Sequence, residues 1–375
     1  MKKILFITSS RADYGLLRNV ILEVQKLNPE TYLMITGSHL SKEFGNTISE
    51  IKKDEIKKII KKKILDNKFK EANISNYLER SIRATSEVIK KFNPATLVIL
   101  GDRYELLGCA MAATIFRIPI THIHGGEVTS GAYDDSIRHS ISKLSHLHFP
   151  IHKQYTKRLI QLGEDPKTIF NYGSLGAYST NNIKLFKKRE LENLFNIKLD
   201  KKIILATFHP VTLEKNKSKS QILNLIKFLN TQNNNIIIIT SPNFDNEAKI
   251  IKSEILNFTK KKDNVYFYNS LGNKVYISFM KIAYLLIGNS SSGVLETPYF
   301  GTRTINIGNR QKGRIISDNI INSDYEFKSI YKAFLTIKKR SKKRSNIFLK
   351  KNTPIKIAKK ILSFKFNLKK EFYDL

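Results

Sequence analysis

The chain has 375 residues, and its 65 Lys and Arg outnumber 32 Asp and Glu, which gives a formal net charge of +33. At roughly 100–200 residues per domain, this length predicts two domains. A hydrophobic content of 41% and an aromatic content of 10% exclude a disordered or collagen-like chain. The single cysteine, Cys109, excludes a disulfide framework and a multi-cysteine metal cluster, and it favours a cytoplasmic location. No apolar run approaches the ~20 residues that span a bilayer, so we expect no membrane insertion.

The excess of positive charge is concentrated in two lysine-rich stretches, 52–70 and 338–351. The first predicts a helix with isoleucines on one side and lysines on the other. The second is compatible with a surface patch, a helix end or a loop. Neither stretch interleaves aromatic with basic residues, as segments that bind nucleic acid do. We therefore expect a lysine-rich surface and no nucleic-acid partner, with a polyanion-binding protein as an alternative.

Short apolar runs alternate with longer helix-like stretches along the chain, which is typical of parallel α/β proteins. A glycine-containing stretch at 173–176 separates two halves with the same rhythm. The predicted fold class is α/β, with two doubly wound parallel-sheet domains whose strand ends surround a shared ligand. Strands are expected at 3–8, 32–36, 97–100, 120–123, 147–150, 169–172, 202–207, 236–240, 265–268, 284–287 and 303–307, and helices at 16–27, 75–92, 106–116, 134–147, 154–162, 181–195, 220–231, 246–258, 274–282 and 293–300.

Two strand-to-helix loops of the first half combine charged and small polar residues. The loop 8–15 holds hydroxyl residues and Arg11, which suits a bound phosphate and equally suits the cap of a helix. The loop 101–105 places Asp102 beside Arg103, an acid or base next to a phosphate-binding cation. Helix capping explains one carboxylate there but not the Asp-Arg pair.

Histidines gather in the middle of the first half, where six of the eight lie between His122 and His152. Their spacing fits a metal site poorly, so we expect no metal and no cofactor. The glycines at 125–126 let the backbone approach a ligand closely. Glu127 and Asp134 offer paired carboxylates for proton transfer. A glycine turn followed by a helix cap is the alternative, and it leaves the histidine density unexplained.

In the second half, two strand ends carry candidate residues. His209 follows the strand expected at 202–207, although a histidine on a surface loop is the simpler interpretation. The stretch 288–293 joins a strand to a helix through three serines and two glycines, which suits a pyrophosphate at the helix start. Glu296, about one turn further, suits the hydroxyls of a ribose. A serine-rich helix cap is the alternative.

In combination these motifs resemble the hydrolysing UDP-N-acetylglucosamine 2-epimerases of sialic-acid and related nonulosonic-acid biosynthesis, from residue 11 to about 314. The stretches that carry the resemblance are Ser-Arg-Ala-Asp-Tyr-Gly at 10–15, Gly-Asp-Arg-Tyr-Glu at 101–105, His-Ile-His-Gly-Gly-Glu at 122–127, Asp-Asp-Ser-Ile-Arg-His at 134–139, His-Pro-Val-Thr at 209–212, Pro-Asn-Phe-Asp at 242–245, Gly-Asn-Ser-Ser-Ser-Gly at 288–293 and Gly-Asn-Arg-Gln-Lys-Gly-Arg at 308–314.

The resemblance implies a GT-B fold, in which two Rossmann-like domains at 1–172 and 173–355 face a central cleft. It also implies a final helix within 356–375 that packs back on the first domain, and a homodimer or homotetramer. The implied reaction eliminates UDP across C1–C2 of the sugar to leave a 2-acetamidoglucal. Water then adds with the opposite stereochemistry at C2, which releases N-acetylmannosamine and UDP.

The resemblance assigns catalytic roles to Asp102, Asp134 and His209. Some family members carry a catalytic glutamate at the position of His124, whereas here Glu127 stands three residues later. Either Glu127 has taken that role, which we favour, or His124 transfers a different proton. The positions that match nucleotide contacts in the family are Arg11, Gly15, Arg103, Asn243, Leu271, Ser290, Ser291, Glu296 and Arg310.

Two further enzymatic hypotheses stay open from the sequence. The same chemistry could act on UDP- or GDP-linked N,N'-diacetylbacillosamine, which would lead to legionaminic acid. A GT-B glycosyltransferase would share the fold but would preserve the stereochemistry at C2 and require an acceptor. The residues around the base and around C4 and C6 of the sugar decide among these substrates, and the motifs do not include them.

Overall fold

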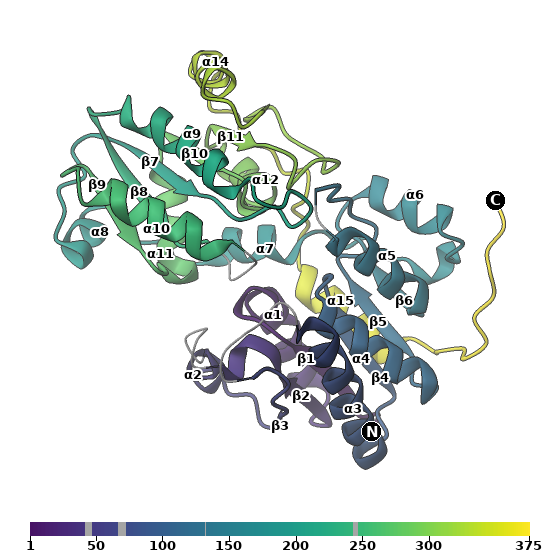
Figure 1. Ribbon diagram of the computed structural model, residues 1–375. Helices are drawn as coiled ribbons and strands as arrows, with labels where there is room; N and C mark the ends of the chain where they lie inside the picture. The colour runs from purple at the N-terminus through teal and green to yellow at the C-terminus, as the bar shows by residue number, and fades with distance from the viewer. Residues whose placement is uncertain (42–46, 67–72, 132, 243–246) are drawn as a thin grey trace. The chain divides into compact units, whose positions relative to one another are not determined.

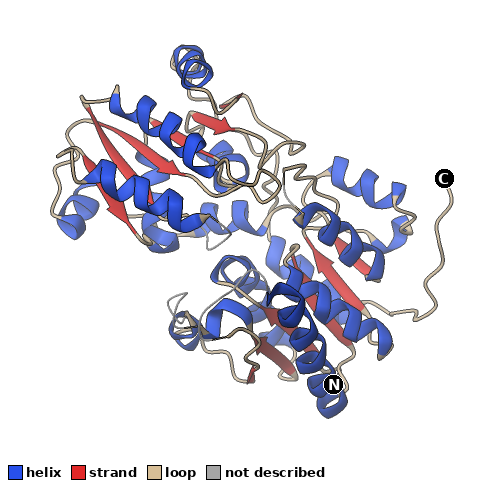
Figure 2. Cartoon of the chain, in the orientation of Figure 1, coloured by secondary structure: helices blue, strands red, loops and turns tan. Residues whose placement is uncertain are grey.

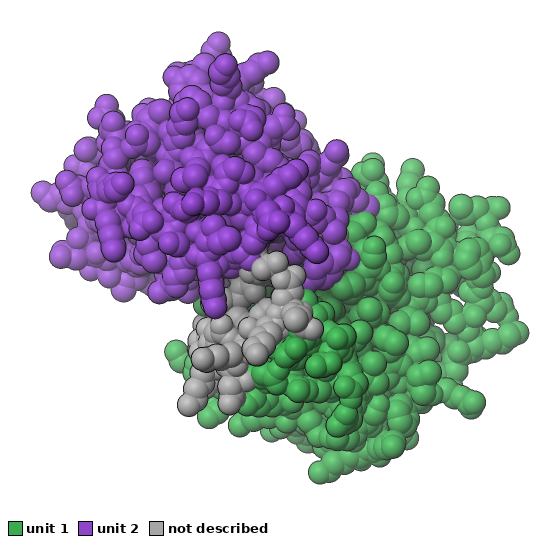
Figure 3. Space-filling view, in the orientation of Figure 1, with its two compact units in different colours: residues 1–127, 134–178, 350–375 green, residues 128–133, 179–349 purple. Residues whose placement is uncertain are grey.

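The computed structural model describes residues 1–41, 47–66, 73–131, 133–242 and 247–375. The chain divides into two compact units, coloured separately in Figure 3. One unit comprises Met1–Glu127, Asp134–Tyr178 and Lys350–Leu375, and the other comprises Val128–Tyr133 and Ser179–Leu349. The domain limits at residues 172 and 355 stay a prediction from the sequence.

The first unit is built on a six-stranded parallel sheet of order β3-β2-β1-β4-β5-β6 (Figure 1). Except for the edge strand β3, its strands are largely buried and rich in isoleucine, leucine and valine, as expected where helices cover both faces of a parallel sheet. The strands are β1 Ile4–Thr8, β2 Thr31–Ile35, β3 Ile59–Lys61, β4 Thr96–Leu100, β5 Ile120–Ile123 and β6 Leu147–Phe149, and the helices are α1 Arg11–Leu27, α2 Ile48–Lys52, α3 Ile74–Phe92, α4 Tyr104–Ile115, α5 Asp134–Leu144, α6 Lys153–Gln161 and α15 Thr353–Ser363. Helix α7, Leu175–Asn182, spans the boundary between the two units.

The second unit repeats the plan with a parallel sheet of order β12-β11-β10-β7-β8-β9 (Figure 2). Its last strand and the helix that follows it were not expected from the sequence. The strands are β7 Lys202–Thr207, β8 Asn235–Thr240, β9 Val265–Tyr268, β10 Leu285–Gly288, β11 Thr304–Ile307 and β12 Ile320–Ser323, and the helices are α8 Lys188–Phe195, α9 Ser218–Asn230, α10 Ala248–Thr259, α11 Gly272–Ile282, α12 Ser292–Leu295, α13 Thr297–Phe300 and α14 Phe327–Ile337.

Both sheets reverse their strand order at one point. The chain starts each sheet in the middle, adds two strands on one side, and then crosses to the other side, so that β1 lies beside β4 and β7 beside β10. Loops that leave adjacent strands in opposite directions open a crevice at the carboxyl ends of the strands, where α/β proteins bind ligands. The loops 8–11 and 101–103 flank that point in the first sheet, and 208–209 and 289–292 flank it in the second.

The helix expected over 52–70 is wrong for residues 53–66, and residues 67–70 lie outside the described part of the chain. Helix α2 ends at Lys52, and Ile59–Lys61 form the edge strand β3, which pairs in parallel with Leu33–Ile35. Isoleucine is β-branched and favours an extended backbone where a sheet edge is open beside it. The apparent helical spacing of the isoleucines was therefore outweighed by strand pairing.

Three other expectations need correction. The helix expected over 181–195 is two helices, α7 and α8, and the helix expected over 293–300 is also two, α12 and α13, with Pro298 in the first turn of the second. The strand expected at 169–172 is reduced to one bridge, between His148 and Ile169.

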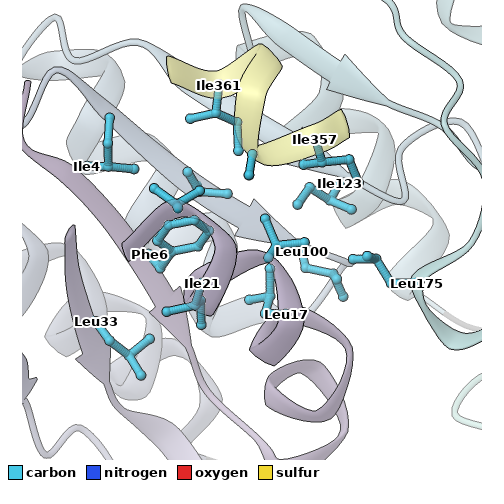
Figure 4. Packing of buried hydrophobic residues seen from close by; sticks show 14 of the residues in the cluster. Ile4, Phe6, Leu17, Ile21, Leu33, Leu100, Ile123, Leu175, Ile357 and Ile361 are labelled. Carbon is cyan, nitrogen blue, oxygen red and sulfur yellow. The ribbon is translucent and has the colours of Figure 1, made fainter. Parts of the chain in front are cut away.

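Helix α15 belongs to the core of the first unit. Figure 4 shows Ile357 and Ile361 of this helix beside Phe6, Leu17 and Ile123 from β1, α1 and β5. At its start, Thr353 donates a hydrogen bond to the carbonyl of Tyr172. The end of the chain thus completes the apolar layer that covers one face of the first sheet.

This packing predicts that Ile361→Ala destabilises the first unit by about 2–5 kcal/mol, because it leaves a cavity in a fully buried cluster. Urea unfolding of the whole protein measures the change. The control is Leu368→Ala in the exposed tail, which we expect to change stability by no more than about 0.5 kcal/mol. Equal effects of the two variants would contradict a structural role for α15.

Candidate functional site

Arg138 organises the charged residues of the first unit. It lies on α5, is 2% exposed, and forms an ion pair with Asp102 at the end of β4. It also donates to the carbonyl of Glu127 at 2.9 Å and to the Asp135 carboxylate at 3.1 Å. Burial alone would lower the pKa of Arg138, but the surrounding carboxylates raise it above its ordinary value. A permanently charged guanidinium therefore holds the Asp102 side chain in place.

Arg138 is not among the functional residues predicted from the sequence. Its motif, Asp-Asp-Ser-Ile-Arg-His, was noticed for its carboxylates. The spacing of the motif could have indicated that Arg138 is buried, because it lies one helical turn after Asp134 and three residues before the fully buried Ile141. An arginine on that side of a helix must find carboxylates or carbonyls inside the protein.

His122 has a structural role at the same strand end. Its Nε2 lies 2.8 Å from the carbonyl oxygen of Gly101, and its Nδ1 lies 3.0 Å from the Ser142 hydroxyl. Because a carbonyl only accepts, Nε2 carries the proton and Nδ1 accepts from the serine. Burial lowers the pKa of His122 to about 3, so the ring is neutral. It fixes the loop that presents Asp102.

His124 and Glu127 form a buried pair. The distance from Nδ1 of His124 to Oε1 of Glu127 is 2.8 Å, and the two side chains are 8% and 1% exposed. Between them, Gly126 adopts a φ of +77°, and a Cβ there would lie 2.5 Å from the Tyr155 carbonyl oxygen. Only glycine fits this turn, which is completed by a hydrogen bond from Arg158 to the Gly126 carbonyl at 2.6 Å. The sequence left open whether His124 or Glu127 takes part in proton transfer, and the structure shows that the two side chains are bonded to each other.

The other predicted residues of the first unit lie as follows. Asp134 begins α5 and is half-buried, and Arg11 begins α1, whose cap is Ser10. Gly15 is exposed on α1, where an added Cβ would meet nothing within 4 Å. Arg103 bonds through two nitrogens to the buried Glu105, at 3.1 Å each. That pairing orients the guanidinium at the start of α4.

Asn289 holds the strand ends of the second unit together. Its side chain accepts from the backbone N–H of His209 at 2.7 Å and donates to the His209 carbonyl at 2.8 Å. The chain at Gly288 passes so close to β7 that a Cβ would lie 1.9 Å from the Thr207 carbonyl oxygen. Burial, and then the charge of Arg310, lower the pKa of His209 well below its ordinary value, so its ring is neutral.

Two of the three serines after β10, Ser290 and Ser292, lie beside Tyr276 of α11. Ser292 lies 2.7 Å from the Tyr276 hydroxyl and 3.0 Å from the Ser290 hydroxyl. Helix α12 has four residues, and its first flanking residue, Ser291, makes no side-chain capping bond. The Ser290 hydroxyl also accepts from the backbone N–H of Ser292, the first residue of α12, at 3.4 Å. Helix α12 ends at Leu295, so the described residues 292–300 do not form the single helix that was expected to present its positive end to a phosphate.

Glu296 lies between α12 and α13 rather than one turn inside a helix, because Pro298 starts a new helical turn. Removal from water raises the pKa of Glu296 to about 7, against the opposing charge of Arg314. Arg310 donates to the Asn289 carbonyl at 3.2 Å. Leu271 is buried in the apolar cluster at the start of α11, and Asn243 lies outside the described residues.

Within the described parts of the chain, no three His, Cys, Asp or Glu side chains gather closely enough to hold a metal ion. No helix in those parts combines the length and apolar character that crossing a bilayer requires.

Comparison with known sequences identifies relatives over most of the chain. A family model described as UDP-N-acetylglucosamine 2-epimerase matches residues 23–362. GDP/UDP-N,N'-diacetylbacillosamine 2-epimerase (hydrolyzing) of Campylobacter jejuni is 43% identical over 326 residues, 86% of this chain and 84% of that protein. Polysialic acid biosynthesis protein P7 of Escherichia coli is 35% identical and covers 100% of this chain and 98% of that protein.

Solved structures share the fold. UDP-GlcNAc 2-epimerase from Neisseria meningitidis, bound to UDP-GlcNAc, has a TM-score of 0.81 at 18% identity and covers 96% of this chain and 100% of that chain. This likeness confirms the predicted α/β fold of GT-B type with two Rossmann-like units. Because the family model and relatives above 30% identity span most of its length, this chain belongs to the UDP-N-acetylglucosamine 2-epimerase family of enzymes.

Proposed function

We propose that this protein is a hydrolysing 2-epimerase of a nucleotide-linked 2-acetamido sugar. The observation that carries the proposal is the set of strand ends that the predicted residues follow. Arg11, Asp102 and Arg103 come after β1 and β4, and His209, Ser290 and Ser291 come after β7 and β10, the strands that flank the switch point of each sheet. His124 and Glu127 come after β5, and Arg310 comes after β11, the next strand outward in each sheet. The first unit supplies carboxylates and a histidine for proton transfer. The second supplies hydroxyls, Glu296 and arginines suited to a nucleoside diphosphate.

The reaction needs a base, a leaving-group site and an acid. Removing the C2 proton sends an electron pair into a C1–C2 double bond as the C1–O bond breaks and UDP departs. Asp102, Asp134 and the His124–Glu127 pair are proposed to handle the protons of this elimination and of the hydration that follows. His209, kept neutral by burial, can donate one hydrogen bond and accept another without adding charge.

The nucleotide part is proposed to bind the second unit. Ser290 and Ser291 offer hydroxyls to the diphosphate, and Arg310 offers a guanidinium. Glu296 is proposed to accept hydrogen bonds from the ribose hydroxyls. Arg11 and Arg103 of the first unit are proposed as further cations for the phosphates.

Two sugars are candidate substrates. UDP-N-acetylglucosamine is the first candidate, because the family model that matches this chain is described by that substrate. The 43% identity to a GDP/UDP-N,N'-diacetylbacillosamine 2-epimerase specifically favours the diacetamido sugar as a second candidate. The chemistry at C1 and C2 is the same for both.

Incubation with each nucleotide sugar in deuterated water tests the proposal. We expect release of the nucleoside diphosphate and a free sugar with inverted C2 that carries one deuterium at that carbon, because the C2 proton is replaced from solvent. Mass spectrometry and NMR of the product measure both features. A product without deuterium at C2 would instead support a glycosyltransferase or a simple hydrolase.

Ser290→Ala should raise KM for the nucleotide sugar about 10-fold or more and leave kcat nearly unchanged, since a hydrogen bond to a charged group is lost in both the ground and transition states. Steady-state kinetics measure the two constants. The control is Ser220→Ala on the exposed start of α9. A fall in kcat with constant KM would place Ser290 in the chemical step instead.

The raised pKa of Glu296 predicts a pH effect on stability. Its carboxyl binds a proton more tightly in the folded protein, with a pKa of about 7, than at its ordinary value of 4.5. Its contribution to stability is therefore fully present below about pH 4.5 and is lost as the pH rises through about 7. Urea unfolding at several pH values should show a smaller loss of stability over this window for Glu296→Gln than for the wild type. The surface variant Glu326→Gln serves as control, and parallel profiles for all three proteins would contradict the prediction.

A further inference from the structure

The two histidines at the end of β5 differ in how their ring nitrogens are satisfied. Both nitrogens of His122 have partners, the Gly101 carbonyl and the Ser142 hydroxyl. His124 has one, because Nδ1 bonds to Glu127, whereas Nε2 is buried without a hydrogen-bond partner among the described residues. A buried polar atom without a partner is uncommon in folded proteins, and it requires an explanation.

The proton positions follow from the partners of Glu127. The charge of Arg138 acts on this carboxyl, and Arg138 donates to the Glu127 carbonyl at 2.9 Å, so a buried cation stands beside it. A carboxylate next to a cation stays ionised and only accepts hydrogen bonds. Nδ1 of His124 therefore carries the proton in their 2.8 Å bond, which leaves Nε2 as the ring nitrogen that can accept a proton.

The backbone at His124 is also unfavourable for a side chain. Its φ is +69°, in the left-handed region that non-glycine residues seldom adopt. A glycine at this position would remove both the strained conformation and the unpartnered nitrogen. A non-glycine residue held in such a conformation is characteristic of functional sites.

We propose, building on the function proposed above, that Nε2 of His124 is the base that takes the C2 proton and that Glu127 is the positioning residue that holds the ring. In this step the C2–H bond breaks and its proton moves to Nε2. The electron pair of that bond becomes the second C1–C2 bond, and the C1–O bond breaks with its pair leaving on the nucleoside diphosphate. The Glu127 carboxylate stabilises the imidazolium that results, as the carboxylate does in other His–carboxylate pairs.

The test compares His124→Gly and Glu127→Gln in the full-length protein, with release of UDP or GDP from the sugar that the wild type processes as the readout. His124→Gly should lower kcat by about 100-fold or more with little change in KM, and added imidazole should restore part of the rate. Its thermal midpoint should equal or exceed that of the wild type, because the strain is relieved. Glu127→Gln should lower kcat less, and imidazole should not restore it.

His152→Asn is the matched control. His152 caps α6 by accepting from the Gln154 N–H, a role that asparagine can fill, so its rate and stability should stay unchanged. If Glu127→Gln does not fold, the imidazole response of His124→Gly decides alone.

Three results would overturn the assignment. The first is a larger loss of kcat in Glu127→Gln than in His124→Gly with no response to imidazole, which would make Glu127 the base. The second is rapid nucleotide release by His124→Gly with accumulation of the 2-acetamidoglucal, which would confine His124 to hydration. The third is a wild-type protein that releases no nucleotide from either sugar, which would refute the proposed function itself.

Discussion

The parallel pairing of every strand in both sheets is the constraint on which the rest of this molecule depends. When all strands run the same way, all their carboxyl ends lie along one edge, and the polar loops that follow them gather there. Strands β1 and β4 are neighbours although more than 80 residues separate them in the chain. The same order in the second sheet brings His209 beside Asn289.

Charged and polar groups at buried strand ends lose contact with water, which costs free energy. The two units compensate for this cost with different partner groups. The first unit uses a buried cation, because Arg138 bonds to Asp102, to Asp135 and to the backbone of Glu127. Removing one partner from such a network leaves a buried charge uncompensated. The second unit uses a neutral group, the amide of Asn289, which satisfies both backbone groups of His209. The first arrangement surrounds a buried cation with acceptors, whereas the second fixes the His209 backbone without adding charge.

Much of the fold was predictable because its signals are local. Runs of apolar residues marked the strands at 120–123, 202–207 and 265–268 at their observed positions. The ends of the other predicted strands were within one residue of the observed ends, except at 169–172, where only one bridge forms. Errors arose where a neighbour decided the outcome. The isoleucines at 59–60 have helical spacing, but an open sheet edge beside Leu33 made them a strand. At Pro298 the missing N–H ended one helix and began another.

For the candidate site too, some features were predictable from local sequence and others depended on distant parts of the chain. The α/β class and the family could be predicted from the residues alone, because alternation, glycine positions and motif spacing are properties of contiguous residues. Only the tertiary structure decided that Arg138 is the buried partner of Asp102, that His122 is fully bonded and neutral, and that His124 and Glu127 act on each other. Burial and hydrogen-bond partners come from strand order and helix packing across long stretches of chain, and no local pattern encodes them.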